Sequence, residues 1–217
     1  MDVTVFGAAG PTGSWICREA LRAGHRVRAV SRRTDPLPFP SAAQLSQVCA
    51  DVVSGAGVLD AIDGADAVLS ALGVAYTRHQ VSLYSAGTQA IVDALRSVGR
   101  GNRLVAVSSG LTYPPPHGLG FIPDTIVFPL LRNVVGRTLY ADIRRMEEIL
   151  RASDDIAWTI MRPGRLFDGP SVSDYRLDID HPSRGYTARG DLAAAMVAEL
   201  DETNAHAHQA VAPTTQR

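Results

Sequence analysis

The sequence has few of the features that mark secreted, membrane or nucleic-acid-binding proteins. It contains only two cysteines, Cys17 and Cys49, which argues against a disulfide framework and favours a reducing compartment; neither has metal-ligand spacing. The formal net charge is −1, so nothing favours a nucleic-acid or membrane-surface partner. No apolar run is long enough to span a bilayer, and the N-terminus reads as a core strand rather than a signal peptide. We therefore expect a cytoplasmic protein without a metal site.

Two catalytic motifs are also missing. The chain lacks G-x-S-x-G, and no His/Asp order completes a triad around Ser108-Ser109-Gly110. No Lys-Ser/Thr pair follows the first glycines, which excludes a kinase-type P-loop. The sequence thus predicts neither a hydrolase nor a P-loop protein.

What the chain does have is an alternation of short apolar segments with amphipathic helical ones. With 217 residues, 46% of them hydrophobic, it can bury a substantial core. The alternation predicts an α/β fold: one doubly wound, Rossmann-like parallel sheet between two layers of helices, a single domain over residues 1–212. Residues 208–212 are expected as an edge strand, and residues 213–217 as a flexible tail. The other strands are expected at residues 2–6, 26–30, 45–49, 67–72, 103–108 and 157–161.

The first strand runs into three glycines at spacing G-x-x-G-x-x-G. Gly7 permits a tight turn, Gly10 lets the backbone approach a pyrophosphate, and Gly13 lets the following helix pack on the strand. The helix predicted over residues 14–23 directs its free N–H groups and its positive dipole end at the phosphates. This stretch therefore predicts a dinucleotide site.

The end of the second predicted strand indicates which dinucleotide binds. Arg32 and Arg33 stand there, and no acidic residue precedes Asp35. An acidic residue at this position binds the 2′-hydroxyl of NAD, whereas arginine accommodates the 2′-phosphate of NADP. We expect NADP, with Arg32 the stronger candidate; a solvated surface pair is the alternative.

Further candidates follow the next two strands. Asp51 could accept a hydrogen bond from the adenine amino group, and Val52 could pack on the ring. Ala71-Leu72-Gly73 ends the fourth predicted strand, and the small residues there would let the backbone approach the cofactor. Each signal is weak alone, but their order after successive strands makes them mutually supportive.

The residues at the reacting end are less clear. Ser108 and Ser109 end the fifth predicted strand and could bind a substrate oxygen. Tyr140 and Arg144 lie one helical turn apart, where the guanidinium could lower the phenol pKa; an ordinary exposed Tyr–Arg pair is the alternative. Tyr113, just after the serines, is a second candidate phenol.

A proline-rich stretch, Tyr113–Pro129, leaves the same strand end. Its composition predicts an irregular loop. Because ligands bind at the carboxyl ends of parallel strands, this loop could be a substrate lid, or simply a surface connection.

These residues together resemble a known family. The glycine turn with Ala71-Leu72-Gly73 resembles the atypical short-chain dehydrogenase/reductases. Residues 146–153, 158–166 and 187–193 resemble the NAD(P)H-binding branch that includes NmrA-like proteins and biliverdin reductase B, a flavin reductase. Asp191 in the last of these segments suits a helix N-cap.

The resemblance implies a role for each matching residue. It places Gly10, Pro11, Thr12 and Gly13 at the pyrophosphate, Arg32 and Arg33 at the 2′-phosphate, Asp51 and Val52 at the adenine, Leu72 and Gly73 at the ribose, Ser109 beside the nicotinamide, and the backbone of Pro163 at the carboxamide.

One departure from the family leaves the reaction open. The Tyr-x-x-x-Lys pair of classical short-chain reductases is replaced by Tyr140-x-x-x-Arg144. We expect an NADPH-dependent reductase of a flavin, quinone or ketone, with a small-molecule substrate, acting as a monomer or homodimer. The alternatives are a non-catalytic NADP(H) sensor of the NmrA-like type and a cofactor-retaining isomerase or epimerase.

Overall fold

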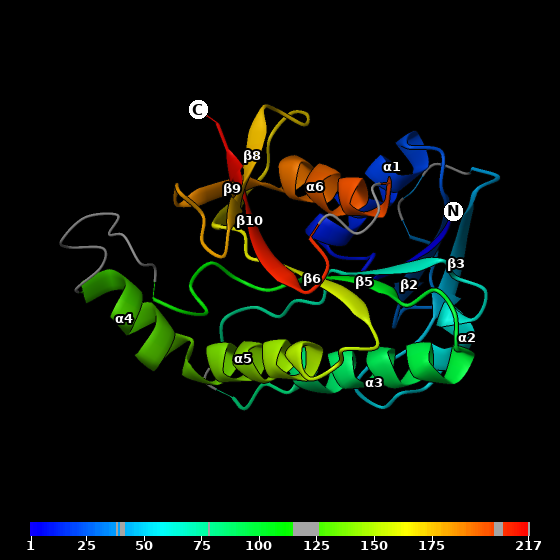
Figure 1. Cartoon of the computed structure of the whole chain (residues 1–217), viewed down its shortest axis with the longest axis horizontal. Coiled ribbons are helices and arrows are strands. Elements are labelled where there is room, and N and C mark those ends of the chain that lie inside the picture. Colours follow the sequence, from blue (N-terminus) through cyan, green and yellow to red (C-terminus); the bar gives the residue numbers. More distant parts are fainter. Residues whose placement is uncertain (38, 40–41, 78, 115–125, 202–205, 217) are drawn as a thin grey trace.

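The protein is built around one central sheet (Figure 1). The structure, a computed structural model, describes residues 1–37, 39, 42–77, 79–114, 126–201 and 206–216. Within them the sheet has eight strands in the order β3-β2-β1-β4-β5-β6-β10-β8, and β7 and β9 form a small second sheet. The strands are β1 Asp2–Phe6, β2 Arg26–Ser31, β3 Leu45–Cys49, β4 Ala67–Ser70, β5 Arg103–Val107, β6 Ala157–Met161, β7 Arg165–Phe167, β8 Tyr175–Ile179, β9 Tyr186–Ala188 and β10 Gln209–Thr215.

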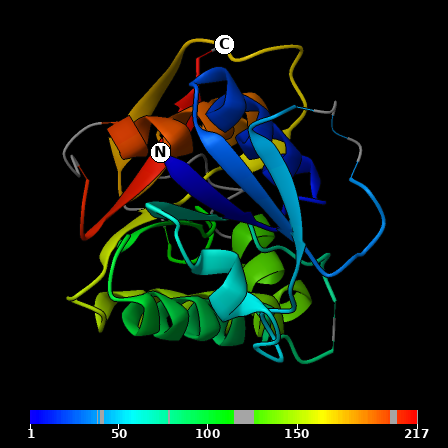
Figure 2. The same ribbon diagram turned by 90° about the vertical axis from the view of Figure 1, so that its right-hand side faces the viewer.

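Helices cover both faces of this sheet (Figures 1 and 2). One face carries α1 and α6, and the other carries α2, α3 and α5. Short α4 and a π-helical segment lead into α5 beyond the sheet. This confirms the expected three-layer, doubly wound fold. The helices are α1 Pro11–Arg22, α2 Val58–Ile62, α3 Leu83–Val98, α4 Phe128–Leu130, α5 Arg137–Arg151 and α6 Arg189–Asp201, with the π-helical turn at Leu131–Val135.

The central strands β1, β4, β5 and β6 are mostly apolar and buried because helices cover both faces of the sheet there. In β1, Val3 and Val5 face the core under α1 and α6, whereas Phe6 faces the core over α2 and α3. All pairings from β3 across to β10 are parallel. A parallel sheet covered on both sides gives continuous apolar strands rather than alternating ones.

The C-terminal segment differs from the expectation. β10 runs to Thr215 and lies between β6 and antiparallel β8, so it is an interior strand and β8 is the edge. Residues 213–215 are buried, and the Thr214 hydroxyl donates to Asp178 Oδ2 at 2.6 Å. The prediction of a tail at 213–217 is therefore wrong for residues 213–215, because the backbone pairs with a strand that carried no clear sequence signal.

Asp191 also plays a different part from the one expected. Its buried carboxylate accepts from the Ser173 backbone N–H at 2.7 Å and from the Ser173 and Thr215 hydroxyls. It lies inside the first turn of α6, which begins at Arg189, so it ties β10 and the approach to β8 onto that helix.

The proline-rich stretch is partly helical. Residues 115–125 lie outside the described residues, so the lid hypothesis is not tested there. Pro129, however, lies in the first turn of α4, where proline is tolerated because its missing N–H is not needed. Among the described residues, no helix combines the length and apolarity that a bilayer crossing requires.

The topology concentrates the candidate residues at one edge. β1 to β6 are parallel neighbours, so their carboxyl ends meet at the same side of the sheet. The chain order reverses between β1 and β4, and ligands of open α/β sheets bind in the crevice at such a point.

Candidate functional site

The glycine turn after β1 is tightly packed against the end of β4. Gly7 has a φ of +79°, and a Cβ there would lie 2.5 Å from the Ala71 carbonyl oxygen. A Cβ on Gly13 would lie 2.1 Å from the Gly7 carbonyl oxygen. Both contacts would be with backbone, so neither position accepts a larger residue without distortion. The turn geometry expected at Gly7 and the close packing expected at Gly13 are confirmed, whereas the approach of Ala71 to the cofactor stays a prediction.

The N-terminus of α1 opens into the same crevice. The turn closes through Gly10 N–H donating to Gly7 O at 2.9 Å, and Pro11 begins the helix. Within the described part of the chain, no side chain caps this helix end. Its first-turn amides, at Thr12 and Gly13, are therefore available to an anion, and the positive end of the dipole favours one. This uncapped, glycine-rich turn has the backbone donors that a dinucleotide pyrophosphate requires.

Arg32 and Arg33 are exposed beyond the end of β2. Their backbone is held from β3: the Gln47 amide donates to Arg33 O at 3.3 Å and to Asp35 O at 2.8 Å. The Ser31 hydroxyl also accepts from Arg33 N–H at 3.1 Å. Among the described residues, neither guanidinium has an ion-pair partner, so both are free to meet a phosphate. The anchoring role of Gln47 carried no signal in the sequence.

The predicted adenine and ribose residues lie together. A Cβ added to Gly87 on α3 would lie 2.7 Å from the Leu72 side chain and 2.9 Å from that of Val52. These two side chains therefore converge on one point of α3. The Asp51 carboxylate forms hydrogen bonds within its own turn: it accepts from Val53 N–H at 3.1 Å and from the Ser54 hydroxyl at 3.2 Å. Its contact with the adenine amino group stays a prediction.

Gly73 follows Leu72 into open space. It is exposed, and a Cβ there would meet nothing within 4 Å among the described residues. Its predicted contact with the ribose stays a prediction.

Ser108 is built into a buried ion pair. Its hydroxyl donates to Glu147 Oε1 at 2.6 Å, and Arg162 Nε donates to the same oxygen at 3.1 Å. Glu147 is fully buried on α5, and Arg162 is 4% exposed after β6. The Ser108 hydroxyl is therefore a donor to this ion pair, and its predicted contacts with the cofactor and with a substrate oxygen stay predictions. Sequence reasoning missed Glu147 and Arg162 because a buried ion pair between a helix and a strand end has no local pattern.

Tyr113 is held by the same ion pair. The Arg162 guanidinium lies 4.7 Å from the centre of the Tyr113 ring, in cation–π contact. Burial raises the pKa of the Tyr113 phenol, and the nearby Glu147 charge adds to this effect. The phenol is not activated as an acid by this environment. Pro163, one residue beyond Arg162, accepts from Gly110 N–H at 2.8 Å through its carbonyl, which places it beside the serine pair.

Tyr140 lies in an environment opposite to the one expected. It is 2% exposed, its ring packs against Gly136, and its hydroxyl lies 2.6 Å from that of Tyr76. Burial raises the pKa of the Tyr140 phenol, the hydrogen bond with Tyr76 adds to this, and the Ser109 hydroxyl opposes it. The prediction that Arg144 lowers this pKa is wrong, as is the alternative of an exposed pair, because desolvation dominates.

Tyr76 is a site residue that sequence reasoning missed. It lies in the loop after β4, four residues beyond Leu72, and its side chain is 51% exposed. A tyrosine so soon after the carboxyl end of a central strand was the available signal. No lysine occurs anywhere in the sequence, so the basic partner of the classical reductases has no substitute elsewhere in the chain.

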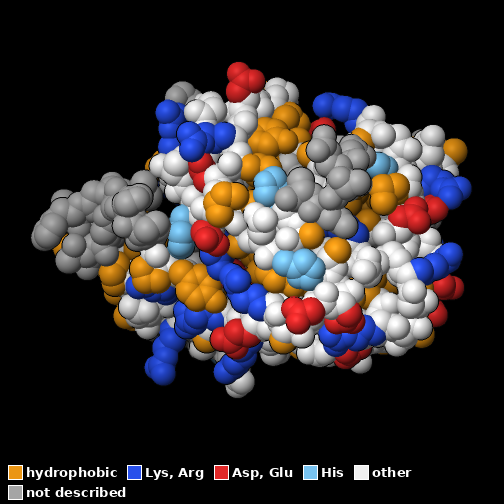
Figure 3. All heavy atoms as spheres, in the orientation of Figure 1, with side chains coloured by type: hydrophobic (Ala, Val, Ile, Leu, Met, Phe, Trp, Pro, Cys, Tyr) orange, Lys and Arg blue, Asp and Glu red, His pale blue; other side chains and the backbone are white. Residues whose placement is uncertain are grey.

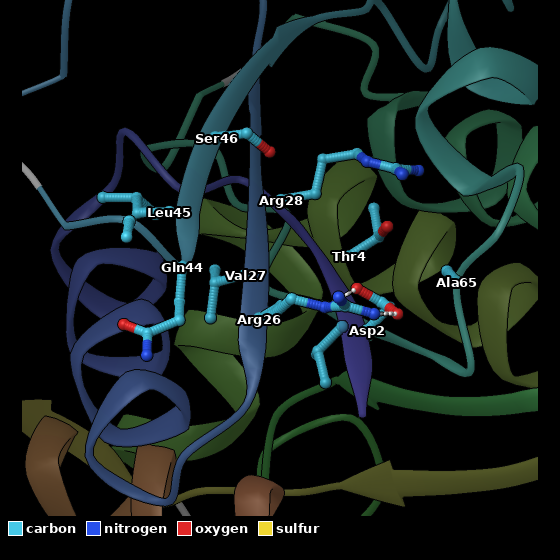
Figure 4. Close-up of a pocket in the computed structure, with 11 residues that line it drawn as sticks. Asp2, Thr4, Arg26, Val27, Arg28, Gln44, Leu45, Ser46 and Ala65 are labelled. Carbon is cyan, nitrogen blue, oxygen red and sulfur yellow. Dashed lines mark hydrogen bonds and ion pairs between the residues drawn. The ribbon is translucent and has the colours of Figure 1, made fainter.

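A pocket at the opposite edge of the sheet holds charged residues that are already satisfied (Figure 4). Arg26 pairs with Asp2 at 2.5 Å, and Arg28 donates to the Ala61 and Asp63 carbonyls, both at 2.7 Å. These residues lie at the amino ends of β1 and β2, away from the glycine turn. The pocket is thus separate from the candidate site.

Relatives of the chain share this architecture. It is 24% identical over 208 residues to the uncharacterized protein YwnB of Bacillus subtilis, covering 93% of this chain and 92% of that one. A candidate NADH-flavin reductase of Streptococcus pneumoniae superposes with a TM-score of 0.78 at 24% identity over 100% of both chains. A short-chain dehydrogenase/reductase of Veillonella parvula, in complex with NADP, superposes with a TM-score of 0.79 at 16% identity over 98% of this chain and 94% of that one.

The family model described as NAD(P)H-binding matches residues 7–203. The match begins at the first glycine of the turn and extends through α6, so it covers nearly the whole α/β domain. The expected resemblance to NAD(P)H-binding reductases is confirmed at this level, whereas the NmrA-like label stays a prediction. The chain belongs to the NAD(P)H-binding family.

Proposed function

We propose that this protein is an NADPH-dependent reductase that acts on a small planar or carbonyl acceptor: a flavin, a quinone or a ketone. The observation that carries the proposal is the convergence of two groups at one sheet edge. The glycine turn after β1 leads into the uncapped N-terminus of α1, and the Tyr140 hydroxyl on α5 meets the Tyr76 hydroxyl from the loop after β4.

The preference for NADPH rests on the free arginines. Arg32 and Arg33 stand where the 2′-phosphate of a bound dinucleotide would lie, and their side chains are exposed. A guanidinium can hold a phosphate with two parallel hydrogen bonds. The NAD(P)H-binding family accommodates either cofactor, and these two arginines favour the phosphorylated one.

Each part of the site has a role in this proposal. NADPH, when bound, would supply the hydride. Gly10 to Gly13 would hold its pyrophosphate, Val52 and Leu72 its adenosine end, and Pro163 its carboxamide. Ser109 would orient the acceptor oxygen, so that positioning, rather than a strong acid, supplies most of the rate.

Apolar side chains beside the site favour a planar, apolar acceptor. Val74 and Tyr76 in the loop after β4 are 41% and 51% exposed. Further exposed apolar residues gather over the α4 region, at the lower left of Figure 3. They are Ile126, Val127, Leu130, Val134 and Val135. A flavin or quinone ring would be recognised by such a surface through stacking and burial.

The setting we propose is the cytoplasm, with a small molecule as the only substrate. Both cysteines are free, as expected in a reducing compartment. A monomer or homodimer remains our prediction for the oligomeric state.

Turnover with a panel of acceptors tests the function. Purified protein is mixed with NADPH and with FMN, a soluble naphthoquinone or a ketone, and absorbance at the NADPH band is followed. We expect oxidation with at least one acceptor, fastest with a planar one. Tight cofactor binding with no oxidation would indicate a sensor instead, and conversion of substrate without net loss of NADPH would indicate an isomerase.

A further inference from the structure

Tyr140 is almost fully buried in the described part of the protein. The residue is 2% exposed, and its ring lies against Gly136 at the junction of the π-helical turn and α5. Reduction of a carbonyl, flavin or quinone adds a hydride and also a proton. A buried phenol that donates its proton must recover one from somewhere.

The usual partner for that recovery is absent. The sequence contains no lysine, and the residue one helical turn from Tyr140 is an arginine, Arg144. A guanidinium is not a proton carrier in proteins. What lies against the phenol instead is a second phenol. The hydroxyls of Tyr76 and Tyr140 are 2.6 Å apart, and their rings meet edge to face with centroids 6.2 Å apart.

The loop that carries Tyr76 is anchored on both sides of it. Val74 N–H donates to the Tyr84 hydroxyl at 3.3 Å, and the Thr138 hydroxyl donates to His79 O at 2.8 Å. Tyr84 lies on α3 and Thr138 on α5, so the two helices under the site fix the loop. The contact between the two phenols is therefore held by the framework rather than made by chance on a free loop.

We propose that Tyr76 is a relay residue, through which a proton from water reaches the Tyr140 hydroxyl and, through it, the acceptor. Tyr76 is suited to the entry point because its side chain is about half exposed, at 51%. The inference rests on the proposed reductase function. It concerns Tyr76, which acts through Tyr140 and need not touch the acceptor.

The transfer balances without an ionised intermediate in the chain. The acceptor gains a hydride, with its electron pair, from bound NADPH, which leaves as NADP⁺. The reduced acceptor atom takes the Tyr140 proton, Tyr140 takes that of Tyr76, and Tyr76 takes one from water or buffer. Each hydroxyl breaks one O–H bond and forms another, so the net reaction consumes one NADPH, one acceptor and one proton.

The variant Tyr76→Phe tests the relay because it removes only the hydroxyl and keeps the ring. With the acceptor that turns over fastest, we expect kcat to fall roughly 10-fold, less than the roughly 10²- to 10⁴-fold contribution of a complete general acid, because the Tyr140 hydroxyl remains. The Kd for NADPH and the KM for acceptor should change less than about 2-fold, as expected when only a proton-transfer step is affected. The solvent deuterium isotope effect on kcat should rise, because proton delivery becomes the slower step. The matched control is Tyr175→Phe on β8, which should leave all four quantities unchanged.

A spectroscopic measurement checks the hydroxyl pair without turnover. In protein labelled with ¹³C at the tyrosine Cζ, Tyr76→Phe should shift the Tyr140 resonance, and Tyr175→Phe should not. An unchanged Tyr140 resonance, or an unchanged kcat and isotope effect, would overturn the relay. If none of the acceptors tested supports oxidation of NADPH by the wild-type protein, the reductase proposal itself fails, and the relay fails with it. The Tyr140 resonance then still reports whether the two phenols are hydrogen-bonded.

Discussion

At the scale of single residues, the candidate site contains two kinds of polar side chain. Some have no partner among the described residues, and others already form hydrogen bonds within the protein. Arg32 and Arg33 have no ion-pair partner among the described residues, so their charge is available to a ligand. The Ser108 hydroxyl and the Asp51 carboxylate are occupied by the protein itself. Freedom from internal partners therefore separates binding candidates from structural residues more sharply than position in a motif does.

Replacing Arg32 with alanine should weaken NADP binding far more than NAD binding. A charge-assisted hydrogen bond contributes about 1.5–3 kcal/mol, which corresponds to roughly 10- to 100-fold in Kd. Calorimetric titration with both cofactors measures the difference. Arg100→Ala, an exposed arginine before β5 at the opposite sheet edge, serves as the control. Equal losses for NADP and NAD would contradict the 2′-phosphate assignment.

At the scale of elements, α5 supports the site by reaching across to its neighbours. Asp142 is fully buried on α5, yet it serves the N-terminus of α3: its Oδ2 accepts from Tyr84 N–H at 2.8 Å, and it also bonds the Ser85 hydroxyl. The N-cap residue of α3, Ser82, makes no capping bond with its own side chain. A helix end is thus capped from another helix, which locks together the two elements that anchor the Tyr76 loop.

Asp142→Ala should destabilise the protein by about 2–3 kcal/mol, because it removes a cap and leaves buried donors unpaired. Urea unfolding followed by circular dichroism measures the change. Asp93→Ala, an exposed carboxylate on α3, is the control and should cost less than about 0.5 kcal/mol. A similar loss in both variants would argue against the capping role.

The sequence predicts the local turns and most of the elements, but not the contacts between side chains of different elements. The turn at Gly7 to Gly13 was predictable because it is set by backbone conformations within a few residues. The pairing of Tyr76 with Tyr140 joins residues 64 positions apart, and Glu147 meets Arg162 from a different element. Such contacts depend on which strands are neighbours in the sheet, and periodicity does not encode that order.

At the scale of the whole molecule, the sheet is completed by the end of the chain. β10 returns to pair with β6 in parallel and with β8 in antiparallel register. Thr214 and Thr215 donate to the buried carboxylates of Asp178 and Asp191. The C-terminal residues therefore close the hydrogen bonding of the last two strands and of α6.

Deleting residues 213–217 should lower the free energy of unfolding by more than about 3 kcal/mol. Two buried carboxylates lose hydrogen-bond donors, and three residue pairs between β10 and β8 are lost. Thermal unfolding of the full chain and the truncated chain measures this. The control deletes only residues 216–217 and should leave the melting temperature nearly unchanged. Equal stability of all three proteins would restore the flexible-tail interpretation.

The sequence by itself determined the α/β class, the glycine turn and the family, because each depends on local backbone constraints and on short-range periodicity. Only the tertiary structure decided that Tyr140 is buried against Tyr76, that the Ser108 hydroxyl belongs to the Glu147 ion pair, and that the C-terminus is an interior strand. These outcomes follow from burial and from strand order, which bring together residues that no local pattern connects.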